Sequence, residues 1–409
     1  IIEFYEKKIG ASKMRKIKDK ILQGTTYAST TLVVLFLVAI ICYILFTGGK
    51  NFQPKMFTSD YYETPYFVHA KTESDLFHYE DKEDVFYSSN WGIGIKDTKD
   101  LNGKDVIQIV ELDNLSPLKN ATNKETNEEF VVKKGLLINR ITIKDEIGNT
   151  RLFTADKGAK AIRDALDTST ILVELYLLKM GGGIRGSLLS TLYLILLTLL
   201  MVIPLGVITA IYFTEIAKNN KINQFLLSLI DMISGIPSII FGLLGLICFI
   251  PIVSKMTGSG GGSILAGAFT MTLMLLPVVI KTTMEAIMTI PKSYKYASLA
   301  LGASMTQTIF KVILPNSIRG ILTSILLAIG RIIGESAALI FAIGTYISDH
   351  VSLSGQSTTL AVHIWTLMSG DNPNYASACS ISIVILIVVL ILNLSIKLIS
   401  YRFDRTRVK

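Results

Sequence analysis

Residues 281–345 read KTTMEAIMTIPKSYKYASLALGASMTQTIFKVILPNSIRGILTSILLAIGRIIGESAALIFAIGT. The first half, up to about Arg319, is polar enough to lie in water, and the second half is apolar enough to span a bilayer. Pro291 and Gly302 predict a short helix between them, because proline is favoured at the start of a helix and glycine just past its end. Pro315 predicts the end of a second short helix, because proline lacks the N–H that continues the hydrogen-bond ladder. This stretch therefore predicts an aqueous helical loop that leads directly into a membrane span.

Long apolar runs extend this prediction to the rest of the chain. Half of the 409 residues are hydrophobic, and a helix needs about 20 apolar residues to cross roughly 30 Å of hydrocarbon. Runs of that length lie at residues 26–47, 187–213, 224–252, 263–284, 318–346 and 376–399. The first run has a basic flank, but it is long and no small-residue cleavage site follows it, so it predicts an uncleaved anchor. The predicted fold class is an all-α polytopic membrane protein with six transmembrane helices and one soluble insert.

Lysine and arginine lie mainly on one side of these spans. They gather in the basic N-terminus, residues 1–25, in the loop from Lys281 to Arg319, and in the tail, residues 401–409. The short loops of the other side hold only Lys255. Because short cytoplasmic loops carry an excess of Lys and Arg, both termini are predicted to be cytoplasmic, in the plasma membrane. The net charge of +8 then reflects topology and anionic lipid, not nucleic acid.

Several chemistries are not predicted for this chain. The cysteines, Cys42, Cys248 and Cys379, each fall inside an apolar run, so they predict neither a disulfide framework nor a metal site. The four histidines are scattered. No Gly-x4-Gly-Lys-Ser/Thr motif occurs, so the chain is not expected to hydrolyse ATP through a P-loop. We predict no catalytic residues, no metal and no cofactor on this chain.

The polar loop, residues 285–319, carries a resemblance to a known family. From Gly302 the spacing is nine residues, Val312, one residue, then Leu314 and Pro315. This resembles the EAA loop of ABC-importer permeases, Gly-x9-Ile-x-Leu-Pro, with valine in place of isoleucine. In that family the loop forms a cytoplasmic coupling helix that docks on a separate ATPase, which carries the ATP and Mg.

The Glu-Ala-Ala of the family motif falls on Tyr296, Ala297 and Ser298, so the acidic residue of the motif is missing here. The resemblance implies ATPase contacts at Tyr296 and Ala297 and also at Gly302, Leu314 and Pro315.

A wider resemblance includes GRIIGESAALIFAIG, which starts at Gly330, and covers residues 14–50 and 181–409. Over these residues the chain is similar to the phosphate permeases of ABC importers, and residues 1–13 are either a native extension or something upstream. The resemblance implies a bacterial inner-membrane complex that imports phosphate. Its other parts would be a second, homologous permease subunit, a dimer of ATPase subunits and an extracytoplasmic phosphate-binding protein.

Two groups of polar residues are candidates for the substrate pathway. Arg331 and Glu335 lie four residues apart in the fifth predicted span, so they are expected to share one face of a helix. Ionisable residues inside a membrane usually mark a pathway, and the alternative is an ion pair that only stabilises the helix bundle. Asp231 and Ser234 lie in the third predicted span, where Asp231 is expected to be partly buried. Its alternative role is that of a hydrogen-bonded structural acid.

The insert, residues 48–186, breaks the membrane pattern and predicts an extracytoplasmic α+β domain. Strand patterns occur in WGIGIK, DVIQIVEL, GLLINRITIKD, TRLF and STILVELYLL, with a turn at Gly148-Asn149 and a helix in ADKGAKAIRDAL. Over about 85–180 the order of elements resembles a PDZ domain. The resemblance implies a peptide-binding loop at Gly92, Ile93, Gly94 and Ile95, and the alternative is a generic domain that spaces the complex. The glycines 181–183 are expected to form a flexible joint to the permease domain, residues 187–400.

The predicted function is the permease subunit of an ATP-driven phosphate importer, coupled to the ATPase through residues 285–319. Three alternatives stay open. The chain could carry another oxyanion, it could anchor an extracytoplasmic binding or signalling scaffold, or it could be a channel that needs no ATPase. The spacing of the coupling loop favours a transporter over the last two.

Overall fold

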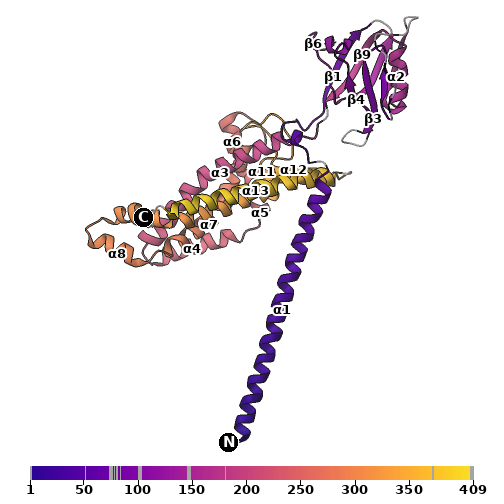
Figure 1. Ribbon diagram of the computed structural model, residues 1–409. Helices are drawn as coiled ribbons and strands as arrows, with labels where there is room; N and C mark the ends of the chain where they lie inside the picture. The colour runs from indigo at the N-terminus through magenta and orange to yellow at the C-terminus, as the bar shows by residue number, and fades with distance from the viewer. Residues whose placement is uncertain are drawn as a thin grey trace. The chain divides into compact units, whose positions relative to one another are not determined.

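The computed structural model resolves the chain into two compact units (Figure 1). The first contains residues 1–53, 190–346 and 352–409, and the second contains residues 54–189 and 347–351. The structure describes residues 2–50, 52–72, 77, 79, 82, 84–99, 104–144, 149–179, 181–370 and 373–405, with the backbone alone for 2–17 and 400–405. We call the first the membrane unit and the second the insert unit.

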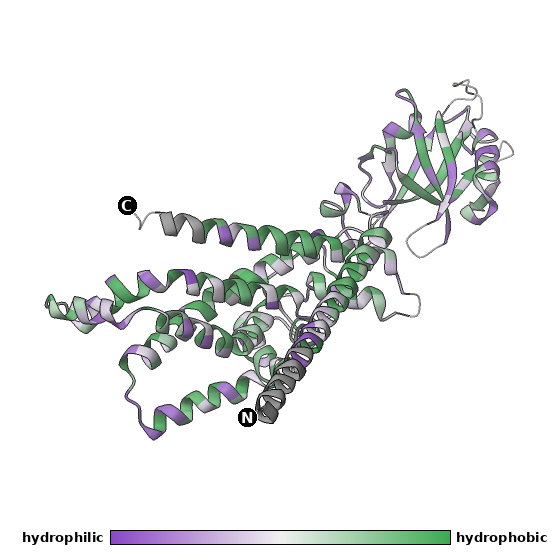
Figure 2. Cartoon of the chain, turned by 60° about the horizontal axis from the view of Figure 1, so that its bottom comes forward, coloured by the Kyte–Doolittle hydropathy of each residue, from purple (hydrophilic) through white to green (hydrophobic). Residues whose placement is uncertain are grey.

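The membrane unit is helical. Its helices are α1 (Ile2–Gly48), α3 (Arg185–Ile211), α4 (Lys221–Ser234), α5 (Ser238–Leu244), α6 (Ile250–Thr257), α7 (Ile264–Met288), α8 (Lys292–Ala300), α9 (Met305–Thr308), α10 (Leu314–Gly334), α11 (Ala337–Ala342), α12 (Leu360–Met368) and α13 (Tyr375–Arg405). Three π-helical turns interrupt them, η4 (Tyr212–Ile216), η5 (Gly245–Phe249) and η6 (Ile309–Ile313). Figure 2 shows hydrophobic residues along most of these helices.

Six stretches of helix within the described residues are long and apolar enough to cross a membrane. They are Lys18–Gly48, Arg185–Ile216, Ser238–Thr257, Ile264–Met288, Met305–Gly334 and Tyr375–Ile399. The prediction of a polytopic membrane protein is confirmed at this level. Pro204 and Pro277 lie inside α3 and α7, which continue through them.

The third predicted span, residues 224–252, is wrong in its limits. Helix α4 ends at Ser234, and Pro237 starts α5 in an extended conformation, with φ −57° and ψ 140°. A proline has no N–H to donate, and it disfavours helical geometry in the residue before it. The spanning helix of this region is therefore 238–257, and the segment before it is a separate amphipathic helix.

The fifth predicted span, residues 318–346, is also wrong in its limits. Helix continues from Met305 to Gly334 and then breaks at Glu335, which has φ −79° and ψ 124°. Pro315 does not end a helix. It lies at the start of α10, directly after the π-turn η6. In a π-turn the hydrogen bonds skip one residue more than in an α-helix, so the missing N–H of Pro315 falls where the bonding pattern changes.

The insert unit is built on one nine-stranded sheet, in the order β2-β3-β4-β7-β9-β1-β5-β6, with β8 paired to β7. The strands are β1 (Thr64–Lys71), β2 (Phe86–Ser88), β3 (Ile93–Lys99), β4 (Asp105–Leu112), β5 (Ala121–Asn123), β6 (Glu129–Phe130), β7 (Leu136–Lys144), β8 (Thr150–Thr154) and β9 (Ile171–Lys179). The predicted strands and the predicted helix, α2 (Ala159–Asp167), are present. Gly148 of the predicted turn lies outside the described residues, but β7 and β8 do pair as a hairpin.

Helix α2 packs against the sheet over an apolar core. Ile162 and Leu166 of α2 are fully buried, together with Trp91. The indole N–H of Trp91 donates to the carbonyl oxygens of Leu166 (3.1 Å) and Ser169 (3.2 Å). Because a buried donor without a partner is costly, these bonds fix the end of α2 above the start of β3.

The glycines 181–183 do not form the flexible joint expected from the sequence. The N–H groups of Gly182 and Gly183 donate to the carbonyl oxygens of Tyr61 and Asp60, both at 2.9 Å. A Cβ on Gly183 would overlap the carbonyl oxygen of Ser59. Glycine is used here because two backbone segments touch. We call this junction, residues 54–63 and 179–189, the neck of the insert.

The sheet sets the limits of the folding unit of the insert. Strand β1 pairs along β9 from Thr64 to Lys71 and contributes the fully buried Val68. We predict that a fragment of residues 62–180 unfolds in one cooperative thermal transition, whereas a fragment of residues 85–180, the predicted PDZ-like segment, does not. Removing β1 exposes one edge of β9 and core side chains worth roughly 1.5–3 kcal/mol each. Thermal unfolding followed by circular dichroism measures this, and equal midpoints for the two fragments would contradict it.

Candidate functional site

Helix α8 begins and ends as the sequence predicts. Pro291 precedes it in an extended conformation, and Gly302 follows it with φ +84°. Gly302 N–H donates to the carbonyl oxygen of Leu299 (3.0 Å), which closes the helix. No heavy atom lies within 4 Å of the position that a Cβ on Gly302 would take. The glycine is therefore needed for its left-handed backbone and not for space.

Helix α8 carries apolar side chains that no described residue buries. None of its residues is buried, and Tyr294, Tyr296 and Leu299 have exposed fractions of 53%, 63% and 37%. Leu301, directly after the helix, is 89% exposed. Ala297 is exposed as well. Exposed apolar side chains gathered on an otherwise polar segment mark a surface that binds a partner.

Two other residues of the predicted coupling motif lie on a different helix and are less exposed. Leu314 and Pro315 are half-buried. Leu314 packs against a cluster that includes the buried side chains of Ile211 and Ile287. These two residues thus connect the base of α10 to the helix bundle, while Tyr296 and Ala297 lie on the open surface.

An ion pair that sequence reasoning missed fastens α8 to the end of α3. Lys295 Nζ lies 2.6 Å from Glu215 Oε2, with side chains 28% and 11% exposed. Glu215 belongs to the π-turn η4. The two residues are 80 positions apart, so no local pattern in the sequence could have indicated the contact. Removing one partner of a half-buried ion pair therefore costs more folding free energy than removing one partner of an exposed pair.

The structure brings Asp231 and Ser234 together with a third residue, Lys281. Lys281 Nζ lies 2.7 Å from Asp231 Oδ1 and donates to Ser234 Oγ at 3.1 Å. Lys281 is on α7, although the sequence placed it at the start of an aqueous loop. Asp231 was expected to be partly buried, but its side chain is 65% exposed. The group thus joins the C-terminal end of α4 to α7.

Arg331 and Glu335 do not share a helix face, because α10 ends at Gly334 between them. Within the part of the chain that the structure describes, they form no ion pair. Arg331 is exposed in the last turn of α10, where the free carbonyl groups of the helix end favour a cation. Glu335 Oε1 instead accepts a hydrogen bond from the backbone N–H of Ala338 (3.2 Å) and so caps α11.

A close backbone contact holds this break in place. A Cβ on Gly242 of α5 would lie 2.8 Å from Cα of Ala338 in α11. Only glycine allows the two helices to approach this closely. Helix α5 of the third predicted span and α11 of the fifth thus pack against each other.

The loop at Gly92, Ile93, Gly94 and Ile95 has no strand edge left for a peptide. Strand β3 pairs with β4 on one side and with β2 on the other. The N–H of Gly92, which has φ +59°, donates to the carbonyl oxygen of Ser88 in β2 (3.0 Å). Peptide addition needs a free strand edge. The expected peptide site is therefore occupied by the chain itself.

Strand β2 is held on its other side by α2. Ser88 Oγ donates to Asp167 Oδ1 at 2.6 Å, and Asn90 Nδ2 donates to the carbonyl oxygen of Asp167 at 2.8 Å. The guanidinium of Arg163 lies 6.0 Å from the centre of the Phe86 ring. These contacts hold residues 86–90 against α2. Across the described residues, no group of three or more His, Cys, Asp or Glu side chains could hold a metal ion.

The second half of the chain matches a known protein family. Residues 185–409 match the model of the binding-protein-dependent transport system inner membrane component. The matched segment starts at the neck and includes every candidate residue of the membrane unit named above.

Named relatives match parts of this chain. A probable ABC transporter permease, YqgI of Bacillus subtilis, is 38% identical over 200 residues, which are 46% of this chain and 66% of that protein. The phosphate transport system permease protein PstA of Haemophilus influenzae is 34% identical over 160 residues, 39% of this chain and 55% of that protein. The chain thus spans less than two thirds of each of these relatives. Among solved structures, the MetNI methionine ABC transporter matches 54% of this chain and 95% of its own, at 20% identity and a TM-score of 0.43.

Proposed function

Because the chain belongs to the family of binding-protein-dependent transport system inner membrane components, we propose that it is the permease subunit of an ATP-driven phosphate importer. The observation that carries the proposal is that a chain with six helices long and apolar enough to span a membrane also has a polar helix, α8, with exposed apolar side chains. The choice of phosphate as the proposed substrate rests on the names of similar proteins. Those of H. influenzae and Mycoplasma pneumoniae, 34% and 31% identical, are named as a phosphate permease and a homologue of one.

Helix α8 is proposed to be the coupling helix that docks on a separate ATPase. Its exposed side chains, Tyr294, Tyr296 and Leu299, supply an apolar contact. The ion pair between Lys295 and Glu215 then passes a displacement of α8 to the end of α3. This pair supports coupling in a chain that lacks the acidic residue of the family motif at Tyr296.

Phosphate needs donors and partial positive charge along its path, because an isolated ion is very costly to bury in hydrocarbon. Arg331 of α10 and Lys281 of α7 are the two cations proposed to serve it, and these two helices pack against each other. Two cations on one chain make only part of a conduit. A second, homologous permease subunit and an extracytoplasmic phosphate-binding protein are the proposed partners that complete it.

The orientation is proposed from charge. The N-terminal segment and residues 281–319 are rich in Lys and Arg, which favours the cytoplasmic side of a bacterial plasma membrane. Helix α8 then faces the cytoplasm, where an ATPase can reach it. The insert lies outside the cell. The order of its strands and helix supports a PDZ-like fold. Because β2 pairs with β3, we favour a structural role for the insert over peptide binding.

The complex itself provides the direct test. We predict that the full chain, purified from its own membrane, brings with it a second permease, an ATPase and a phosphate-binding protein, and that the complex takes up phosphate when ATP is supplied. Mass spectrometry identifies the subunits, and radiolabelled phosphate measures uptake into vesicles. Uptake of a different oxyanion with no phosphate would overturn the substrate. Recovery of the chain without any ATPase would favour the scaffold or the channel.

Coupling is tested at Gly302. We expect Gly302→Asp to leave the chain in the membrane but to abolish ATP-dependent uptake, because the left-handed backbone disfavours a side chain there and the new charge lies beside the docking surface. Gly302→Asn is the matched control, because asparagine tolerates this conformation and adds no charge. Copurification of the ATPase is measured together with uptake. If Gly302→Asp keeps both, α8 is not the coupling helix.

The substrate role of Arg331 is tested by a change that keeps its charge. Arg331→Lys loses the planar pair of donors suited to phosphate. We expect roughly tenfold lower uptake, because one hydrogen bond to a charged group is worth about 1.5 kcal/mol, with assembly and ATP hydrolysis retained. Arg319→Lys, at the other end of α10, is the matched control. Because Glu335 caps α11, Glu335→Gln should keep most of the uptake. Normal uptake by Arg331→Lys would remove Arg331 from the pathway.

A further inference from the structure

The connection between α11 and α12 is divided between the two units of the chain. Residues 347–351 follow α11 and precede α12 in the sequence, yet their contacts place them in the insert unit. Ile347 is buried there, at 3% exposure. The insert thus contacts not only the two segments that lead into and out of it but also a third segment of the chain. We call residues 347–351 the docked connection.

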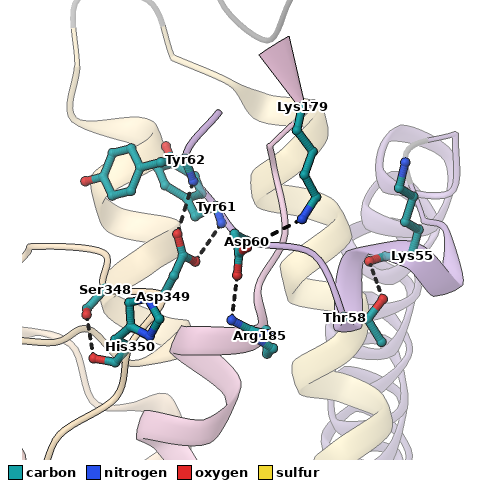
Figure 3. Close-up of polar contacts among 10 residues, drawn as sticks. All are labelled: Lys55, Thr58, Asp60, Tyr61, Tyr62, Lys179, Arg185, Ser348, Asp349 and His350. Atoms are coloured by element: carbon teal, nitrogen blue, oxygen red, sulfur yellow. Dashed lines mark hydrogen bonds and ion pairs between the residues drawn. The ribbon is translucent and has the colours of Figure 1, made fainter. Parts of the chain in front are cut away.

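One carboxylate links the two chain segments of the neck. Asp60 Oδ1 accepts a hydrogen bond from the guanidinium of Arg185 at 2.6 Å, and Asp60 Oδ2 lies 3.7 Å from Lys179 Nζ (Figure 3). Lys179 ends β9 and Arg185 begins α3. Together with the backbone bonds of Gly182 and Gly183, this carboxylate makes the neck a closed junction.

A second carboxylate fastens the docked connection to the neck. Asp349 Oδ1 accepts a hydrogen bond from the backbone N–H of Tyr61 at 2.7 Å, and Asp349 Oδ2 lies 3.4 Å from the N–H of Tyr62 (Figure 3). Hydrogen bonds from backbone N–H groups to a carboxylate are among the strong ones. Since the donors are backbone groups, substituting Tyr61 or Tyr62 leaves them in place, and the side chain to change is that of Asp349.

Backbone packing holds the docked connection from a second direction. A Cβ on Gly186, in the first turn of α3, would overlap the carbonyl oxygen of Ser348. Ser348 Oγ also donates to the carbonyl oxygen of His350 at 2.7 Å, which shapes the turn around Asp349. The docked connection thus lies between the start of α3 and residues 61–62.

We propose that Asp349 is a positioning residue for transport, which fastens the connection between α11 and α12 to the neck so that this connection and the insert move as one body. The proposal rests on the proposed transport function. Helix α11 is capped by Glu335 and follows the break after Arg331. Residues 343–346 alone separate α11 from the docked connection, so we expect that loosening this connection changes how the break responds during transport.

The test compares Asp349→Ala in the full complex with the parent chain. Hydrogen exchange followed by mass spectrometry should show about tenfold faster exchange of the amides of Tyr61 and Tyr62, as expected for loss of a charge-assisted bond. Amides of β1 and β9 should be unchanged, which shows that the insert remains folded. Phosphate uptake should fall by a similar factor while ATP hydrolysis continues. His350→Ala, an exposed neighbour that keeps its backbone carbonyl group, is the matched control.

A second variant tests the same contact without changing charge. Gly186→Ala forces a methyl group against Ser348 and should also speed exchange of the two amides and lower uptake. Unchanged exchange in Asp349→Ala overturns the fastening. Faster exchange with normal uptake overturns its role in transport. If the parent complex imports no phosphate, the proposed function fails, whereas the exchange comparison still decides whether Asp349 fastens the connection.

Discussion

Inside hydrocarbon every backbone N–H and C=O must find a partner within the protein, and the membrane unit follows from this constraint. Helices α3 and α7 continue through Pro204 and Pro277, and the helix around Pro315 continues through a π-turn. The chain leaves helical geometry at Pro237 and at Glu335. A helix break frees backbone groups that need other hydrogen-bond partners. At the second break, Glu335 accepts a hydrogen bond from a backbone N–H at the start of α11.

The sequence predicted the membrane architecture well because apolar length is a strong signal. It did not predict where the spans break, because a break inside an apolar run leaves the composition unchanged. Arg331 and Glu335 illustrate this. Their spacing of four residues indicates one helix face only if the helix continues, and here it ends at Gly334. The end of α8 was predictable, because Gly302 is a local signal with a local cause.

Contacts between distant residues account for most of what the sequence could not reveal. Lys295 pairs with Glu215, Lys281 pairs with Asp231, and Asp349 binds the backbone of Tyr61. Each pair joins elements that come together only in the complete fold. Local periodicity and residue propensity therefore cannot predict these contacts. The same holds for β2. The residues of the loop before β3 suggested a peptide site, but nothing local indicated that the chain supplies the neighbouring strand itself.

These contacts change how the insert is understood. A flexible joint and an open strand edge would describe a tethered domain that binds free peptides. At the two places where the sequence suggested them, the described residues form neither: the glycines of the neck pack against residues 59–61, and β2 pairs with β3 at the predicted peptide loop. Asp60 and Asp349 each accept a hydrogen bond from a residue far away in the sequence, and these two carboxylates therefore hold the segments of the neck together.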